Sequence, residues 1–135
     1  MTKVDNIIFC LRTANSENHS VNISKILSAL TPEYIPGLFS FSIFFTLLDL
    51  DYSREHSLSV CFTDPDGIDV VKIENQTIPA NMHHTSNLPN EYSGIHIVMD
   101  WNNVNLKSSG LYTIKIIYDE NEIGSKSIYV KGKNE

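Results

Sequence analysis

One apolar stretch constrains the fold more than any other part of the chain. Residues 38–48 read LFSFSIFFTLL, and every second position from residue 39 to residue 47 carries a large apolar side chain: Phe39, Phe41, Ile43, Phe45 and Leu47. The other face is mostly hydroxylic, interrupted by Phe44. Because successive side chains of a strand point to opposite faces, this pattern predicts a β-strand with one face in a hydrophobic core.

The same alternation recurs along the chain in shorter runs. Apolar side chains alternate over residues 7–11, 58–62, 70–73, 95–101 and 112–118, and a last run ends at residues 128–130. Asp64-Pro65-Asp66-Gly67 has the composition of a β-turn. Seven or eight short strands separated by turns predict one domain over residues 1–135. Its expected fold is an all-β, antiparallel two-sheet β-sandwich, immunoglobulin-like or C2-like.

Three segments do not follow this alternation. In residues 21–30, Ile23, Ile26, Leu27 and Leu30 recur at helical spacing, whereas Val21 and Ile23 alternate as in a strand, so a short helix and a bulged strand fit equally well. Residues 74–92 hold two prolines and little periodicity, which predicts a long irregular connection. Residues 102–110 are interpreted as a turn region.

Size and charge limit the kinds of partner. A chain of 135 residues is long enough for one core, and its net charge of −6 argues against a nucleic-acid partner. The N-terminal apolar run is too short for a secretory signal, and no stretch approaches a membrane span. We therefore expect a cytoplasmic protein without a membrane partner, in which Cys10 and Cys61 are reduced and buried.

Acidic loops and adjacent histidines are the candidates for a metal site. Asp49 and Asp51 flank one connection, and Asp64 and Asp66 belong to the predicted turn. Calcium needs six to eight converging oxygens, and sequential hairpins would place these two loops at opposite ends of the sandwich. Adjacent histidines such as those at positions 83–84 do not readily share one tetrahedral zinc site. No metal and no cofactor are therefore expected.

Motifs for catalysis are absent from the sequence. It contains no Gly-x-Ser-x-Gly, no His-Glu-x-x-His and no glycine-rich phosphate loop. Cys61 alternates outward on its strand, but no neighbouring residue in the sequence argues for a lowered thiol pKa. The chain is therefore expected not to be an enzyme.

Aromatic and polar side chains near strand ends are the candidates for partner binding. Trp101 and Asn102 lie at the end of one strand, and Tyr52 and Tyr92 lie in loops. Tryptophan and tyrosine dominate interface hot spots. Phe44, on the polar face of its strand, would add an apolar stripe if it were uncovered. The alternative for Trp101 is that it continues the apolar face of residues 95–99 and closes the core.

The C-terminal forty residues resemble the final hairpin of many bacterial immunoglobulin-like domains. The sequence Gly110-Leu111-Tyr112 opens one strand, and residues 127–130 close the next. In such domains the tyrosine at the position of Tyr112 ties its hydroxyl back to nearby backbone as a corner. The Cys…Trp…Cys pattern of true immunoglobulin domains is absent, so the resemblance concerns architecture.

The whole chain resembles a family of small, uncharacterised proteins from bacteria and their phages. The shared features are a first strand like residues 7–11, a segment like residues 22–27, a proline like Pro36 before a long apolar strand, and the final hairpin. The resemblance implies that residues 21–30 are strand-like, and it brings no catalytic residues.

These observations favour a non-enzymatic module that binds a protein partner or a second copy of itself. One version is a phage-encoded inhibitor of a host defence protein. A different class is a calcium- or lipid-binding C2-like domain, which requires the acidic loops to converge.

Overall fold

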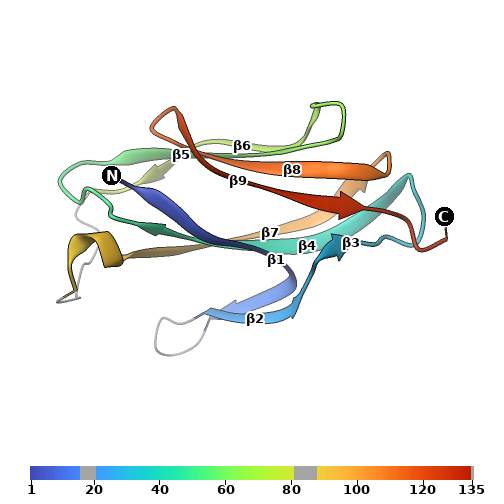
Figure 1. The fold of residues 1–135 in the computed structure, drawn as a ribbon, viewed down its shortest axis with the longest axis horizontal. Coiled ribbons are helices and arrows are strands. Elements are labelled where there is room, and N and C mark those ends of the chain that lie inside the picture. Colours follow the sequence, from blue (N-terminus) through green and yellow to red (C-terminus); the bar gives the residue numbers. More distant parts are fainter. Residues whose placement is uncertain (16–20, 81–87, 135) are drawn as a thin grey trace.

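Two β-sheets packed face to face form the molecule (Figure 1). The computed structural model describes residues 1–15, 21–80 and 88–134. One sheet has four strands in the order β2-β1-β4-β7, and the other has five in the order β3-β9-β8-β5-β6. No helix in the described ranges is long and apolar enough to cross a bilayer. The strands are β1 (Lys3–Asn15), β2 (Val21–Ile26), β3 (Ala29–Leu30), β4 (Gly37–Leu48), β5 (His56–Thr63), β6 (Asp69–Ile78), β7 (Gly94–Leu106), β8 (Gly110–Tyr118) and β9 (Asn121–Val130), and a 3-10 helix, η1 (Asn90–Tyr92), precedes β7.

The strand predicted from residues 38–48 is β4, and its apolar face forms the centre of the core. Phe41, Ile43, Phe45 and Leu47 are at most 2% exposed. β4 lies between β1 and β7, so its hydrogen-bonding groups are paired on both sides. The prediction of a core strand is therefore confirmed.

An aromatic cluster joins the two sheets. Phe62 of β5 lies 6.1 Å from the ring of Phe9, 5.7 Å from Phe41 and 5.8 Å from Trp101, all in the four-stranded sheet. On its own sheet it lies 5.4 Å from Tyr112. These centroid separations fall within the range of favourable ring pairs, so the cluster fixes how the sheets face each other.

The final hairpin has the predicted corner. The hydroxyl of buried Tyr112 donates to the carbonyl of Ser108 over 2.8 Å. The turn between β8 and β9 consists of Asp119 and Glu120, both with positive φ (48° and 69°), as a two-residue type I′ turn requires.

Asparagines accompany three irregularities that the alternation did not predict. Asn6, Asn75 and Asn103 have φ of 53–54° and lie where β1, β6 and β7 each carry one extra residue against their partners. Asparagine tolerates this left-handed conformation better than most residues. At each bulge the extra residue changes which sequence positions, odd or even, face the core. The strand therefore continues past a point where the alternation in the sequence is interrupted.

Two predicted connections are consequently shorter than expected. β7 runs through residues 102–106 with Val104 and Leu106 buried, so the prediction of a turn from residue 102 was wrong. β6 likewise continues to Ile78, inside the segment predicted to be irregular, and residues 90–92 form η1. β1 extends to residue 15, beyond the alternation of residues 7–11.

The ambiguous segment 21–30 is extended. It forms β2 and β3, and Lys25 has a φ of 57° near the end of β2. Leu30 is fully buried, whereas Ile26 is 69% exposed. β3 pairs with β9 in parallel, so the described residues form nine strands and one sheet is mixed. The expectation of seven or eight wholly antiparallel strands was wrong on both points.

A buried histidine joins the β4–β5 connection to the turn between β8 and β9 through hydrogen bonds. His56 is 5% exposed, its Nδ1 lies 2.6 Å from Asp119 Oδ2, and its Nε2 lies 2.7 Å from the carbonyl of Asp51. Asp119 also accepts hydrogen bonds from Ser57 N–H (2.9 Å) and Arg54 (3.0 Å).

The electrostatics of Asp119 follow from these contacts. Burial raises the pKa of its carboxyl, but the hydrogen bonds from Ser57 and His56 and the charges of His56 and Arg54 outweigh burial and lower the pKa below its ordinary value. A carboxyl with a lowered pKa stabilises the folded state above its unfolded pKa, and this stabilisation is lost as the pH falls through the folded pKa.

We expect Tyr112→Phe to lower the free energy of unfolding by about 1–2 kcal/mol, because it removes a buried hydrogen bond and keeps the ring. Urea denaturation measures the change. Tyr129→Phe is the matched control, since Tyr129 is 52% exposed on the neighbouring strand. Equal effects of the two substitutions would contradict a stabilising corner.

We expect Asp119→Asn to destabilise the protein by about 2 kcal/mol near pH 6, because it removes charge-assisted hydrogen bonds. Asparagine also tolerates the positive φ of this position, so the turn is retained. The difference from wild type should begin to shrink as the pH falls below about 4, where the carboxyl of the unfolded chain becomes protonated, and it should disappear once the pH is below the lowered folded pKa as well. Urea denaturation from about pH 2 to 6 tests this, with Glu120→Gln as the control; a difference independent of pH would refute a stabilising role for the Asp119 carboxylate.

Candidate protein-interaction edge

Two of the residues proposed to bind a partner are buried. Trp101 is 6% exposed and Phe44 is 8% exposed. Trp101 packs edge-on against Phe41 at 5.5 Å, so the alternative in which it closes the core is confirmed. Phe44 lies on the outer face of its sheet, and the ring of His96 lies 5.3 Å from it. Neither ring is exposed as an anchor in this structure, and their role in binding stays a prediction.

The other three proposed residues are more accessible. Tyr92 is 64% exposed in η1, and Tyr52 packs partly against the core. The segments that carry them are joined, because Asn90 Nδ2 donates to Asp49 Oδ1 (2.8 Å) and to the carbonyl of Leu50 (3.1 Å). Asn102 is exposed on β7, ten residues after η1.

The acidic loops lie at opposite ends of β5, as the sequence predicted. Asp51 accepts a 3.0 Å hydrogen bond from Ser53 N–H. Asp64 accepts bonds from Asp66 N–H and Ile68 N–H, both at 2.9 Å, which fixes the predicted turn. These carboxylates stabilise their own loops. The adjacent histidines at positions 83–84 lie outside the described residues.

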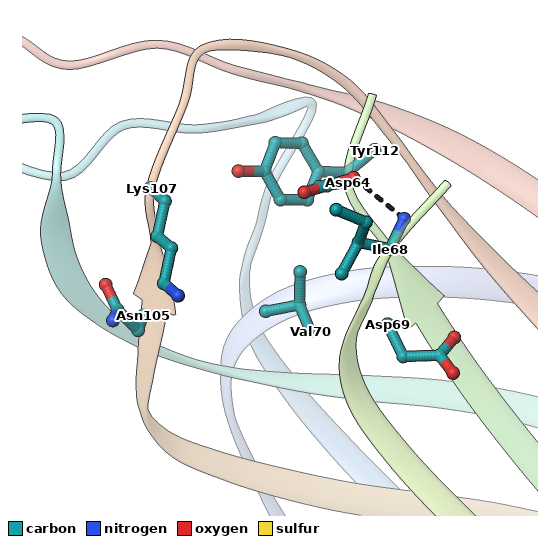
Figure 2. A pocket seen from close by; sticks show the side chains of 7 residues that line it. All are labelled: Asp64, Ile68, Asp69, Val70, Asn105, Lys107 and Tyr112. Atoms are coloured by element: carbon teal, nitrogen blue, oxygen red, sulfur yellow. Dashed lines mark hydrogen bonds between the residues drawn. The ribbon is translucent and has the colours of Figure 1, made fainter. Parts of the chain in front are cut away.

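A hollow of about 220 Å³ lies between the ends of β6 and β7 (Figure 2). Lys107 and Asp69 lie on opposite sides of it, and Tyr112 closes its inner side. Its volume is below the roughly 300–1,000 Å³ of typical small-molecule pockets. Asp64 lines it as well, but its carboxylate is occupied by the turn.

The two thiols face outward from different sheets. Cys10 lies opposite Ser42 on the outer face of the four-stranded sheet, and Cys61 lies opposite Lys72 and Lys115 on the outer face of the other. Both are free and buried, and burial raises the pKa of each thiol. A raised pKa reduces the thiolate fraction, so neither sulfur is activated as a nucleophile.

The β7 edge of the four-stranded sheet has main-chain groups that no described strand pairs. β7 pairs with β4 on one side, and no other strand of the described residues pairs with its second side. Asp49 N–H donates to the carbonyl of the opposite residue Ser93 at 3.1 Å, which continues the β4–β7 register. Such direct pairs alternate along an antiparallel ladder. The main-chain groups of His96, Val98 and Asp100 therefore point away from β4, to the free edge.

The side chains of these three residues lie on the outer face of the sheet. His96 Nδ1 lies 3.0 Å from Thr46 Oγ1, and Asp100 Oδ1 accepts a hydrogen bond from Ser42. Val98 lies opposite Phe44 on β4. The partly buried residues Ile97 and Met99 alternate with them and pack against the core.

The other edge strands are protected against further pairing, whereas β7 is not. β6 carries Lys72, bound to Glu74 at 2.8 Å, and a bulge at Asn75. β2 has an exposed Lys25 at positive φ, and β3 has only two residues. Lysines, bulges and short length are the usual devices that prevent edge pairing. β7 has thirteen residues and neither lysine, arginine nor proline, and its bulge at Asn103 leaves residues 94–101 regular.

Sequence reasoning missed His96, Val98 and Asp100. The absence of basic residues and proline between residues 94 and 106 is visible in the sequence. Whether a strand lies at an edge depends on the order of strands in the sheet, and periodicity does not give that order.

Solved structures with a similar fold include two proteins of low sequence identity. An immunoglobulin-like protein from Pseudomonas aeruginosa matches with a TM-score of 0.53 and 14% identity, over 97% of both chains. The Pseudomonas fluorescens alkylpurine DNA glycosylase AlkC, bound to DNA containing an abasic-site analogue, matches with a TM-score of 0.56 and 9% identity. That match covers 96% of this chain, which spans only 30% of the glycosylase chain. At these identities the likeness concerns the fold alone.

No curated protein matches this chain significantly. The resemblance to an uncharacterised family is confirmed, because the model of one family of unknown function matches residues 7–131. The match includes all nine strands except the start of β1. The chain therefore belongs to the family of unknown function DUF6941.

Proposed function

We propose that this chain is a non-enzymatic protein-interaction module that binds its partner through the free edge of β7. The observation that carries the proposal is a long edge strand that has no lysine, arginine or proline and, over residues 94–101, no bulge to block pairing. An extended segment of a partner can add a strand to such an edge, with main-chain hydrogen bonds supplying affinity.

The chemistry of the buried polar groups supports binding rather than catalysis. Both nitrogens of His56 are engaged by Asp119 and by the carbonyl of Asp51, so the imidazole holds the fold together. The pKa of each thiol is raised by burial. The groups best suited to proton transfer or nucleophilic attack are thus occupied by structural contacts or protonated.

The alternatives receive different support. A phage-encoded inhibitor of a host defence protein is a version of the same proposal, and the net charge of −6 suits a basic partner surface. A cytoplasmic setting in a bacterium or phage-infected cell suits two reduced, buried thiols. A calcium- or lipid-binding C2-like role is not favoured, because β5 separates the acidic loops by about 26 Å.

We expect Val98→Lys to abolish capture of the partner, because a lysine at the centre of an edge opposes strand addition. The test uses tagged protein as bait in a lysate of the cells that encode it. Leu111→Lys is the matched control, since Leu111 is 55% exposed on the other sheet.

Stoichiometric capture of one protein by wild type and Leu111→Lys, and its loss with Val98→Lys, would support the proposal. An untagged copy of the same chain counts as a captured protein in this test. Equal capture by all three baits would rule out the β7 edge, and a wild-type bait that captures nothing would contradict the proposed function.

A further inference from the structure

We propose that the partner of the β7 edge is a second copy of this chain, with the two β7 strands antiparallel and Val98 opposite Val98 of the second copy. The two four-stranded sheets would then form one continuous eight-stranded sheet across a two-fold axis. This inference rests on the proposed function and names its partner.

The phase of the ladder limits the possible registers. Since His96, Val98 and Asp100 direct their main-chain groups outward, an added β7 must place its own outward residues opposite them. In the registers that satisfy this condition, even-numbered residues of one copy lie opposite even-numbered residues of the other. One allowed register becomes the next when one strand slides by two residues along the other. Three outward residues on each strand would supply about six main-chain hydrogen bonds.

Charge complementarity selects one of these registers. With Val98 on the two-fold axis, His96 of each copy lies opposite Asp100 of the other, which gives two imidazole–carboxylate pairs. A shift of one step places Asp100 opposite Gly94 or Val98, and a shift of two steps places His96 opposite His96 or Asp100 opposite Asp100. An isologous contact must be self-complementary, and only the Val98-centred register meets that condition with these side chains.

Each of the two side chains keeps one polar atom for such a contact. His96 uses Nδ1 for Thr46, and its ring packs against Phe44, so Nε2 takes no part in the contact with Thr46. Asp100 uses Oδ1 for both Ser42 and Thr13, the latter at 3.5 Å, and no residue of the described chain bonds to its Oδ2. Both side chains are exposed, so they can meet without rearrangement of the core.

The test measures mass in solution by size-exclusion chromatography with light scattering. Wild type should have twice the chain mass of 15.3 kDa. Val98→Lys and Val98→Asp should each be monomeric, because each places like charges opposite each other on the axis. An equimolar mixture of the two variants should recover a dimer, since lysine then faces aspartate.

Ile8→Lys is the control that distinguishes pairing through the β7 edge from packing through the outer face of the four-stranded sheet. Ile8 lies opposite Phe44 in the same row as Val98, but β1 is paired on both sides, so this variant should remain dimeric. Circular dichroism establishes that each variant is folded. Independently of any variant, the amide hydrogens of His96, Val98 and Asp100 should exchange more slowly as wild-type concentration rises.

The outcomes separate this inference from the proposed function. A monomeric wild type whose capture of another protein is lost with Val98→Lys would overturn self-pairing and keep the interaction edge. A monomeric wild type without edge-dependent capture would overturn both. A wild-type dimer that Ile8→Lys also dissociates, or that Val98→Lys and Val98→Asp leave intact, would overturn the edge register.

Discussion

The packing of Phe62 between the two sheets is the contact on which the rest of the structure depends. Its ring meets Phe9, Phe41 and Trp101 of the opposite sheet and Tyr112 of its own. Aromatic side chains bury roughly 150–250 Å² each, so a cluster of five supplies much of the apolar area that holds two sheets together. Trp101 participates as an apolar surface, since its indole N–H meets no acceptor among the described residues.

Two buried polar side chains make hydrogen bonds at the ends of the sandwich. Tyr112 joins the start of β8 to the turn before it, and His56 joins the β4–β5 connection to the turn between β8 and β9. These contacts satisfy main-chain groups where strands end and ladder bonds stop. Along the edge strands no such side-chain contacts cover the main-chain groups. Whether another strand can pair there depends on the charged side chains, prolines and bulges of each edge strand.

The sequence was a good guide wherever an alternation ran without interruption. β4, β5 and β8 follow period two throughout their buried faces, and the turn at residues 64–67 is determined by local chemistry. Predictions failed at the bulges, because Asn75 and Asn103 shift the phase of β6 and β7 and make a continuing strand look irregular. The two-residue β3 is too short for any periodic signal.

The candidate site was less predictable than the fold. Residue type suggested Trp101 and Phe44 as anchors, but burial is set by tertiary packing and both are covered. The exposed groups of β7 are main-chain atoms, which have no signature in residue type. Strand order made β7 an edge, and strand order emerges only when all strands are placed.

The position of the two cysteines gives each sheet its own chemical probe. Cys10 and Cys61 lie on opposite outer surfaces of the sandwich, with both sheets between them, so they cannot form a disulfide within the folded chain. Each is nearly or fully shielded from solvent. A thiol reagent therefore reacts with each cysteine only after local unfolding exposes it, and the two labelling rates would report separately how often each sheet unfolds locally.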